Sequence, residues 1–244
     1  MILFKSLGTF YISPHKLFVE NNTAYKNQPT INQQKSITLP KKFKTREELG
    51  FNKNDHLYVC LQTFYKLNPE FETCLARILE LDPNGIILLS NTFPYCRSHL
   101  ERMKNNIGLE KLKRVKWYGS LEKDEFLNIV SISDVCLDPF PFGGCNTSYD
   151  AFDYNIPVIT YPSEFLHGQF THGLYKKMGP EMMECCVSSP EHYAQLAATI
   201  GINDKLRHKI NRNIEMKKHL IFQEQESIEE WTYFLEKSKA KITF

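Results

Sequence analysis

Residues 137–161 read LDPFPFGGCNTSYDAFDYNIPVITY, and this stretch joins two apolar segments through a glycine-rich loop. The pattern predicts a buried strand over 135–137 and, after a break at Asp138-Pro139, a loop rich in proline and glycine. A short helix over 148–154 and a second buried strand over 158–161 follow. This order predicts a strand–loop–helix–strand unit.

The loop has the composition of a phosphate-binding turn. Gly143 and Gly144 carry no Cβ, so their backbone allows a ligand to come close. Asn146, Thr147 and Ser148 stand at the expected helix start, where backbone N–H groups and hydroxyls favour an anion. We therefore predict that this loop binds phosphate groups.

Apolar and helix-like segments alternate along the rest of the chain. Further strands are predicted over 56–61, 86–89, 114–118 and 185–187, and further helices over 45–50, 69–81, 95–106, 123–132, 166–178, 190–200, 204–219 and 228–237. Such alternation predicts βαβ units in a single doubly wound, Rossmann-like parallel sheet with helices on both faces. The short apolar strands are typical of strands covered on both sides.

Composition limits the class of protein. The 244 residues are 42% hydrophobic and 24% charged with a net charge of +2, so no global charge favours nucleic acid. The seven cysteines are scattered without CxxC spacing, which disfavours zinc or a disulfide framework and favours a reducing, cytoplasmic compartment. No apolar run is long enough to span a bilayer, so no membrane partner is expected.

The chain is expected to contain one main domain. Residues 1–38 are polar and rich in Asn and Gln, and we interpret them as an extended arm or linker. The Rossmann-like domain is predicted over 39–238, with a tail at 239–244.

Topology predicts where a ligand binds. In a doubly wound sheet the first and fourth strands are neighbours at the switch point, and ligands bind at their carboxyl ends. The loop after the first strand holds Gln62, Thr63 and Lys66. Lys66 should therefore face the loop at 143–147.

Several residues allow two interpretations. Thr147 either binds the ligand or caps the helix with Asp150 as its capping-box partner. Asp150 alternatively accepts both hydroxyls of a ribose. Lys123 begins a helix, against the dipole, which favours a nearby anionic partner. Phe140 and Phe142 are interpreted as core residues.

Other common site patterns are missing. No GxGxxG follows the first strand, and there is no P-loop, G-x-S-x-G elbow, HExxH or Asp-x-Asp. No metal and no cofactor are therefore expected. A leaving diphosphate would have to be stabilised by lysine and backbone N–H groups.

Five segments in order resemble the C-terminal catalytic half of the O-linked N-acetylglucosamine transferases and their SPINDLY-type relatives. They are YVCLQTFYKLNP at 58–69, DVCLDPFPFGG at 134–144, NTSYDA at 146–151, PVIT at 157–160 and LYKKMG at 174–179. The resemblance covers about 39–234. It implies the donor-binding lobe of a two-lobed GT-B-type glycosyltransferase.

The resemblance also implies residue roles. It implies that Lys66 contacts the diphosphate of a UDP-sugar and helps UDP to leave, while Asn146 and Thr147 hold the phosphates. It implies that Asp150 holds the ribose, and that Lys123 and the backbone near Leu121 lie beside the nucleotide. The implied reaction is inverting, metal-independent transfer of a sugar to a protein Ser or Thr hydroxyl. With the loop residues, the predicted nucleotide-sugar site is Gln62, Thr63, Lys66, Leu121, Lys123, Gly143, Gly144, Cys145, Asn146, Thr147, Ser148 and Asp150.

Four positions depart from the family pattern. Phe126 replaces a histidine near the uracil of the animal enzymes, and Ile129 replaces a nearby arginine. Gln169 stands where bacterial relatives have an arginine, and Cys145 replaces a histidine of the animal phosphate loop. These departures leave the base and the sugar open.

The acceptor lobe of the family has no counterpart in the sequence. Residues 1–38 are too few for a second lobe, because one βαβ unit alone takes about 30 residues or more. We favour a transferase whose acceptor lobe comes from a partner chain or from a second copy. The alternative is a non-catalytic nucleotide-sugar-binding module or degenerate subunit, and a nucleotide-binding protein unrelated to sugars is less favoured.

Overall fold

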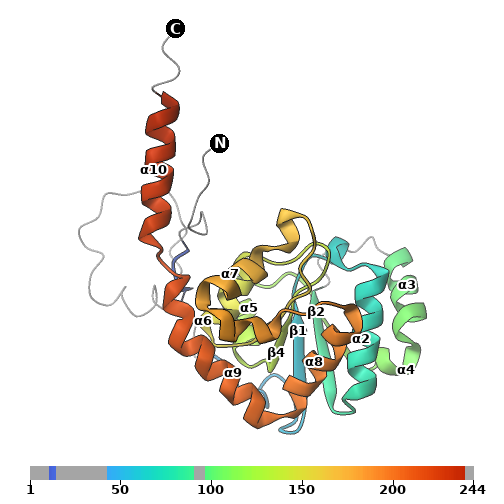
Figure 1. Ribbon diagram of the computed structural model, residues 1–244. Helices are drawn as coiled ribbons and strands as arrows, with labels where there is room; N and C mark the ends of the chain where they lie inside the picture. Colours follow the sequence, from blue (N-terminus) through green and yellow to red (C-terminus); the bar gives the residue numbers. More distant parts are fainter. Residues whose placement is uncertain (1–10, 15–42, 91–96, 240–244) are drawn as a thin grey trace.

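Five parallel strands form one sheet in the order β3-β2-β1-β4-β5 (Figure 1). The computed structural model describes residues 11–14, 43–90 and 97–239. The strands are β1 (His56–Cys60), β2 (Gly85–Ser90), β3 (Val115–Tyr118), β4 (Val135–Leu137) and β5 (Val158–Ile159). β1 pairs with β4 through Tyr58–Val135 and Val59–Cys136, which confirms the predicted switch point.

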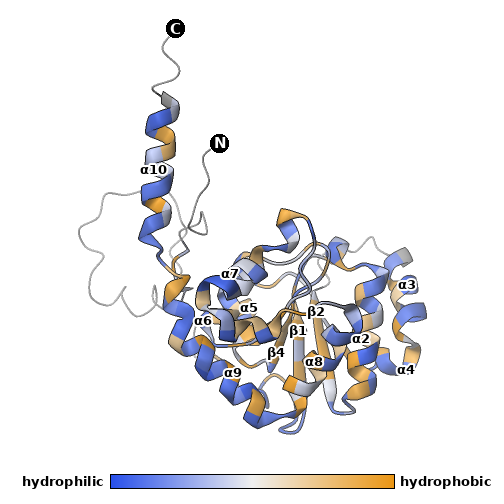
Figure 2. Ribbon diagram, in the orientation of Figure 1, coloured by the Kyte–Doolittle hydropathy of each residue, from blue (hydrophilic) through white to orange (hydrophobic). Residues whose placement is uncertain are grey.

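The strands are buried on both faces of the sheet. Consecutive residues Val59 and Cys60 are both buried, as are Leu88 and Leu89. Because successive side chains of a strand point to opposite faces, helices must cover both sides. Figure 2 shows the apolar colour concentrated on the strands and the polar colour on the outer helix surfaces. The doubly wound α/β prediction is confirmed.

The helices connect and cover the strands. They are α2 (Pro69–Leu81), α3 (Arg97–Ile107), α4 (Leu109–Leu112), α5 (Lys123–Ser131), α6 (Asn146–Asp153), α7 (Phe170–Met178), α8 (Pro190–Ile202), α9 (Asp204–Lys217) and α10 (Gln225–Lys239). α2 packs along α8, and α8 contacts β1, β4 and β5. α10 extends away from the sheet (Figure 1).

Local signals explain several helix starts. The Asn68 side chain accepts a hydrogen bond from the Phe71 N–H at 2.8 Å, and Pro69 occupies the first position of α2. Ser189 caps α8 in the same way, again with a proline at the first position. An N-cap side chain followed by proline satisfies and pre-organises the first helical turn.

Two predicted elements are wrong. Residues 185–187 were expected to form a strand, but Pro180–Cys185 is a 3-10 helix (η4), and only the isolated bridge Thr160–Cys186 extends the sheet. The predicted helix at 45–50 is absent, and residues 46–50 form turns. The capping-box bonds are nevertheless present, because the Thr45 N–H donates to the Glu48 carboxylate at 2.7 Å and the Glu48 N–H donates to the Thr45 hydroxyl at 3.3 Å.

Several predicted helices have different limits. The predicted helix 166–178 is divided into a 3-10 turn, η3 (Leu166–Gly168), and α7. The predicted helix 204–219 ends as α9 and continues as η5 (Lys218–Leu220). α3 begins at Arg97, and residues 95–96 of its predicted start lie outside the described residues.

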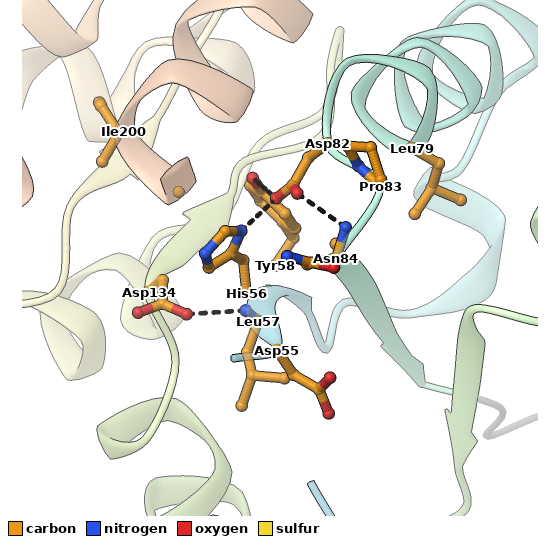
Figure 3. Close-up of polar contacts among 12 residues, drawn as sticks. Asp55, His56, Leu57, Tyr58, Leu79, Asp82, Pro83, Asn84, Asp134 and Ile200 are labelled. Carbon is orange, nitrogen blue, oxygen red and sulfur yellow. Dashed lines mark hydrogen bonds and ion pairs between the residues drawn. The ribbon is translucent and has the colours of Figure 1, made fainter. Parts of the chain in front are cut away.

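The buried Asp82 carboxylate joins β1 to the turn that precedes β2, at the amino ends of the strands (Figure 3). Asp82 Oδ2 lies 2.7 Å from both His56 Nδ1 and the Tyr58 hydroxyl, and Asp82 Oδ1 accepts the Asn84 N–H at 3.0 Å. Tyr58 packs so closely on Gly201 of α8 that any Cβ there would overlap the hydroxyl. The cluster therefore fixes the sheet end opposite the predicted site.

A second carboxylate, Asp134, ties the same end to flanking segments. It accepts the Leu57 N–H at 2.8 Å (Figure 3) and pairs with Arg46 at 2.8 Å and Arg207 of α9 at 3.2 Å. Asp134 is only 4% exposed, so the two guanidinium groups and the N–H compensate a buried charge. This contact holds α9 against the start of β4.

Most of the predicted arm lies outside the described residues, but residues 11–14 pack against the domain. The Ser13 hydroxyl donates to the Asp153 carboxylate of α6 at 2.5 Å. The boundary at residue 39 stays a prediction. In the described part of the chain, no helix combines the length and apolarity needed to cross a membrane.

Candidate nucleotide-binding site

Lys66 connects the loops that follow β1 and β4. It ends the 3-10 helix η2 (Phe64–Lys66), and its ammonium donates to Gln62 Oε1 at 2.9 Å and to the Gly143 carbonyl at 2.8 Å. The ammonium also lies 4.3 Å from the centre of the Phe142 ring. The two loops therefore face one crevice, as the topology predicts.

The charge of Lys66 is held in a partly dehydrated place. Burial lowers the pKa of Lys66, while the nearby Asp138 carboxylate acts in the opposite direction. A cation that has already lost part of its hydration binds an added anion more strongly than a fully hydrated one. The Lys66 ammonium is therefore suited to a phosphate group.

The loop leaves little room for a side chain at either glycine. A Cβ on Gly144 would lie 2.4 Å from Thr147 Oγ1 and 2.9 Å from Gln62 Nε2. A Cβ on Gly143 would lie 3.0 Å from both carboxylate oxygens of Asp138. Gln62 Nε2 also donates to Thr147 Oγ1, so the loop after β1 and the start of α6 lock together around the glycine backbone.

Asp138 supports the loop from inside the fold, a role that the sequence interpretation missed. Its carboxylate accepts the Gly144 N–H and, at 2.8 Å, the Thr160 hydroxyl of the segment after β5. Burial raises the pKa of Asp138, and the Gly144 hydrogen bond is the largest effect that opposes the rise. The sequence signal for Asp138 is its place directly after a buried strand, where Asp138-Pro139 also ends the strand.

The start of α6 presents backbone donors. Cys145 is the N-cap residue and makes no side-chain capping bond. Its carbonyl accepts the N–H groups of Ser148 and Tyr149, and within the described residues the N–H groups of Asn146 and Thr147 have no hydrogen-bond partner. Asn146 is exposed. This helix start therefore has two donors and a positive dipole end available for an anion.

The capping-box interpretation of Thr147 is wrong. α6 begins at Asn146, one residue before Thr147, and the Thr147 hydroxyl pairs with Gln62. Asp150 is not a capping-box partner of Thr147, because its carboxylate contacts Lys123 and Tyr11. Ser148 is buried, and its hydroxyl lies 2.7 Å from the Thr171 hydroxyl of α7.

Asp150 lies one helical turn further along α6 and is buried. Lys123 Nζ, at the start of α5, lies 2.6 Å from Asp150 Oδ2, which supplies the anionic partner expected for Lys123. The Tyr11 hydroxyl donates to Asp150 Oδ1 at 2.9 Å. Burial raises the pKa of Asp150, and Lys123 opposes the rise more than Tyr11 does.

The remaining predicted residues differ in their surroundings. Thr63 Oγ1 is buried without a hydrogen-bond partner among the described residues, and Leu121 packs against the core. Phe140 is buried as predicted, but Phe142 is 40% exposed, because its loop turns its ring toward Lys66 and solvent. Ile129 is buried in the core.

A cavity of about 30 Å³ lies behind the loop, bordered by Gln62, Asp138 and Thr147. This volume suits a water molecule and is far too small for a nucleotide. A larger ligand would have to contact the loop outside this cavity, for example at the exposed Asn146. The described residues contain no group of three or more His, Cys, Asp or Glu side chains placed to hold a metal ion.

The fold and this loop define the class: a Rossmann-like α/β domain with an open helix start at the sheet switch point. The chain matches glycosyl transferase family 41 over residues 8–227 and belongs to that family. The matched region includes Tyr11 as well as residues 39–227 of the predicted domain.

Two curated relatives come from an animal and a plant. The UDP-N-acetylglucosamine–peptide N-acetylglucosaminyltransferase of Caenorhabditis elegans is 27% identical over 151 residues, which are 61% of this chain and 13% of the relative. The probable enzyme of the same description, SEC, of Arabidopsis thaliana is 25% identical over 192 residues, or 78% and 18% of the two chains. This chain therefore spans less than a fifth of either relative.

Solved structures agree on the fold. The K341M mutant of Thermobaculum terrenum O-GlcNAc transferase superposes with a TM-score of 0.64 and 21% identity, covering 79% of this chain and 37% of that one. Anabaena HepE in complex with UDP and glucose gives a TM-score of 0.57 at 12% identity, covering 80% and 51%. The chain thus has the α/β fold found in one part of longer glycosyltransferases.

Proposed function

We propose that this chain binds a UDP-linked sugar in the crevice between the loops after β1 and β4. The diphosphate lies on the free N–H groups of Asn146 and Thr147 and against the Lys66 ammonium. The ribose lies toward Asp150, whose carboxylate accepts hydroxyl donors. The observation that carries this proposal is the 2.8 Å contact of Lys66 with Gly143, which sets a cation beside an open helix start.

The proposed reaction is transfer of the sugar to a Ser or Thr hydroxyl of a protein, with inversion. The hydroxyl oxygen bonds to the anomeric carbon while the bond from that carbon to the diphosphate oxygen breaks and its electron pair leaves with UDP. Lys66 and the α6 N–H groups stabilise the charge that develops on the diphosphate. This chemistry supports a reaction that needs no metal ion.

A second lobe has to present the acceptor and the base that takes its proton. We propose that a partner chain or a second copy of this chain supplies that lobe. The six cysteines in the described part of the chain are free thiols, which supports a reducing compartment such as the cytoplasm.

Calorimetric titration tests the binding step. UDP, UDP-GlcNAc, UDP-glucose and GDP-fucose are titrated separately, with and without EDTA, and the ligand that binds is then assayed for transfer and hydrolysis. The proposal expects a UDP ligand to bind at micromolar to millimolar concentration, unaffected by EDTA. No binding of any ligand at millimolar concentration overturns it, and binding without turnover identifies a non-catalytic module.

A further inference from the structure

Tyr11 is held on several sides although it lies far from the sheet in sequence. Its ring stacks on Tyr149 of α6 with a centroid distance of 4.4 Å and an interplanar angle of 10°, and it packs at a tilt on Phe222. The Tyr11 carbonyl accepts the Gln223 N–H at 3.0 Å. The hydroxyl is therefore fixed toward Asp150 by packing and by the backbone.

A second contact fixes the same segment to the same helix. The Ser13 hydroxyl bonds to Asp153, three residues after Asp150. Residues three apart lie on one face of a helix. Tyr11 and Ser13 thus lie along one face of α6.

Lys123 and Tyr11, which cover Asp150, differ in how easily each side chain can be displaced. Asp150 is 2% exposed, whereas Lys123 is 43% exposed and reaches Oδ2 with a flexible side chain. Tyr11 is enclosed by two rings, Tyr149 and Phe222. A ribose that approaches Asp150 can displace Lys123 without breaking the fold, but displacing Tyr11 would break a ring stack and a backbone hydrogen bond.

We propose that Tyr11 is a positioning residue of the nucleotide site: it fixes the Asp150 carboxylate, and an incoming ribose replaces Lys123, not Tyr11, at that carboxylate. A carboxylate offers about four acceptor positions, so one donor on Oδ1 leaves room for ribose hydroxyls. The inference rests on the proposed function. It makes a residue far outside the predicted domain part of the site.

The protonation of Tyr11 agrees with this role. Burial and the neighbouring Asp150 charge raise the pKa of Tyr11 above its ordinary value. The hydroxyl therefore stays protonated at neutral pH and acts only as a donor toward Asp150.

The test variant is Tyr11→Phe, which keeps the ring and removes the hydroxyl. Calorimetry measures UDP, 2′,3′-dideoxy-UDP and inorganic pyrophosphate with the wild type, the variant and the control Tyr233→Phe, whose tyrosine is exposed on α10. UDP affinity is expected to fall about tenfold in Tyr11→Phe, the loss of one hydrogen bond to a charged group. Pyrophosphate and dideoxy-UDP lack the ribose hydroxyls, so each should bind the wild type and Tyr11→Phe with equal affinity.

The outcomes separate this inference from the proposed function. Unchanged or tighter UDP binding by Tyr11→Phe overturns the positioning role. Tighter binding would mean that the Tyr11 hydroxyl competes with the ribose for Asp150. An equal loss for UDP and pyrophosphate also overturns it, because it indicates a general structural defect. A wild type that binds neither UDP nor pyrophosphate removes the proposed function, and this inference with it.

Discussion

The Lys66 ammonium lies 2.8 Å from the carbonyl oxygen of Gly143, although 77 positions separate the two residues in sequence. The contact exists because β1 and β4 are neighbours in the sheet, although β2, β3 and the helices α2, α3, α4 and α5 intervene along the chain. It links the cation of one loop to the glycine backbone of the other. The proposed diphosphate site depends on this pair.

Lys66→Ala should weaken UDP binding at least about tenfold, because it removes a charged hydrogen-bond donor worth about 1.5–3 kcal/mol. Lys113→Ala is the matched control, since Lys113 is 69% exposed and pairs only with Glu110 in the described residues. Calorimetric titration of both variants provides the comparison. UDP affinity that is equal in the two variants would remove Lys66 from the site.

Gly144→Ala should displace the loop, because the new methyl group would lie 2.4 Å from Thr147 Oγ1. The overlap is expected to lower the free energy of unfolding by about 1–3 kcal/mol and to weaken pyrophosphate binding. Gly119→Ala is the control, because nothing lies within 4 Å of a Cβ there. Urea unfolding and pyrophosphate titration measure both effects, and equal behaviour of the two variants would contradict the tight packing at Gly144.

Asp138→Asn should change how stability depends on pH. Burial raises the pKa of Asp138 in the folded state above its ordinary value of 3.8, which applies to the unfolded state. At pH values between 3.8 and the raised pKa, the folded state therefore binds more protons than the unfolded state. The contribution of Asp138 to the free energy of unfolding therefore falls as pH rises through this window. Asparagine does not titrate there.

Urea unfolding of wild type and Asp138→Asn at several pH values from 4 upward tests this sign. The free energy of unfolding of the wild type, minus that of the variant, should decrease as pH rises. A constant difference across the series would show that the Asp138 pKa is not raised. The absolute difference also contains the lost hydrogen bonds to Gly144 and Thr160, so the trend is the informative quantity.

Asp134→Ala should destabilise the domain by about 3–5 kcal/mol, because it leaves Arg46 and Arg207 without their buried partner. Asp204→Ala is the control, since Asp204 is 71% exposed and pairs with Arg207 only at the surface. It should cost about 1 kcal/mol or less. Thermal or urea unfolding measures both, and similar losses would mean that Asp134 does not anchor α9.

Local sequence patterns predicted the strands of the sheet and most of the helices that cover it. The apolar runs of β1, β2 and β4 are short and continuous, and their pattern is strong because both of their faces are buried. The pattern failed at residues 185–187, where a short apolar run after a 3-10 helix forms only one bridge. A run of three residues carries too little information to distinguish a strand from a packed turn.

The site was only partly visible in the sequence. Glycines followed by Asn146 and Thr147 at a helix start indicated an anion-binding loop, since backbone chemistry there depends on local residues alone. Asp138 was missed because burial and its contact with Thr160 arise from the packing of β4 beside β5. Tyr11 was missed because a polar arm carries no periodic signal of what it contacts.

The sequence by itself determined the order of strands and helices, the glycine loop and the presence of a lysine after the first strand. These follow from side-chain size, polarity and backbone freedom over a few neighbouring residues. Only the tertiary structure decided that Gln62 bonds to Thr147, that Asp150 is shared by Lys123 and Tyr11, and that Thr147 does not cap α6. Such contacts depend on which surfaces remain to be buried after the sheet has formed, and that is a property of the whole chain.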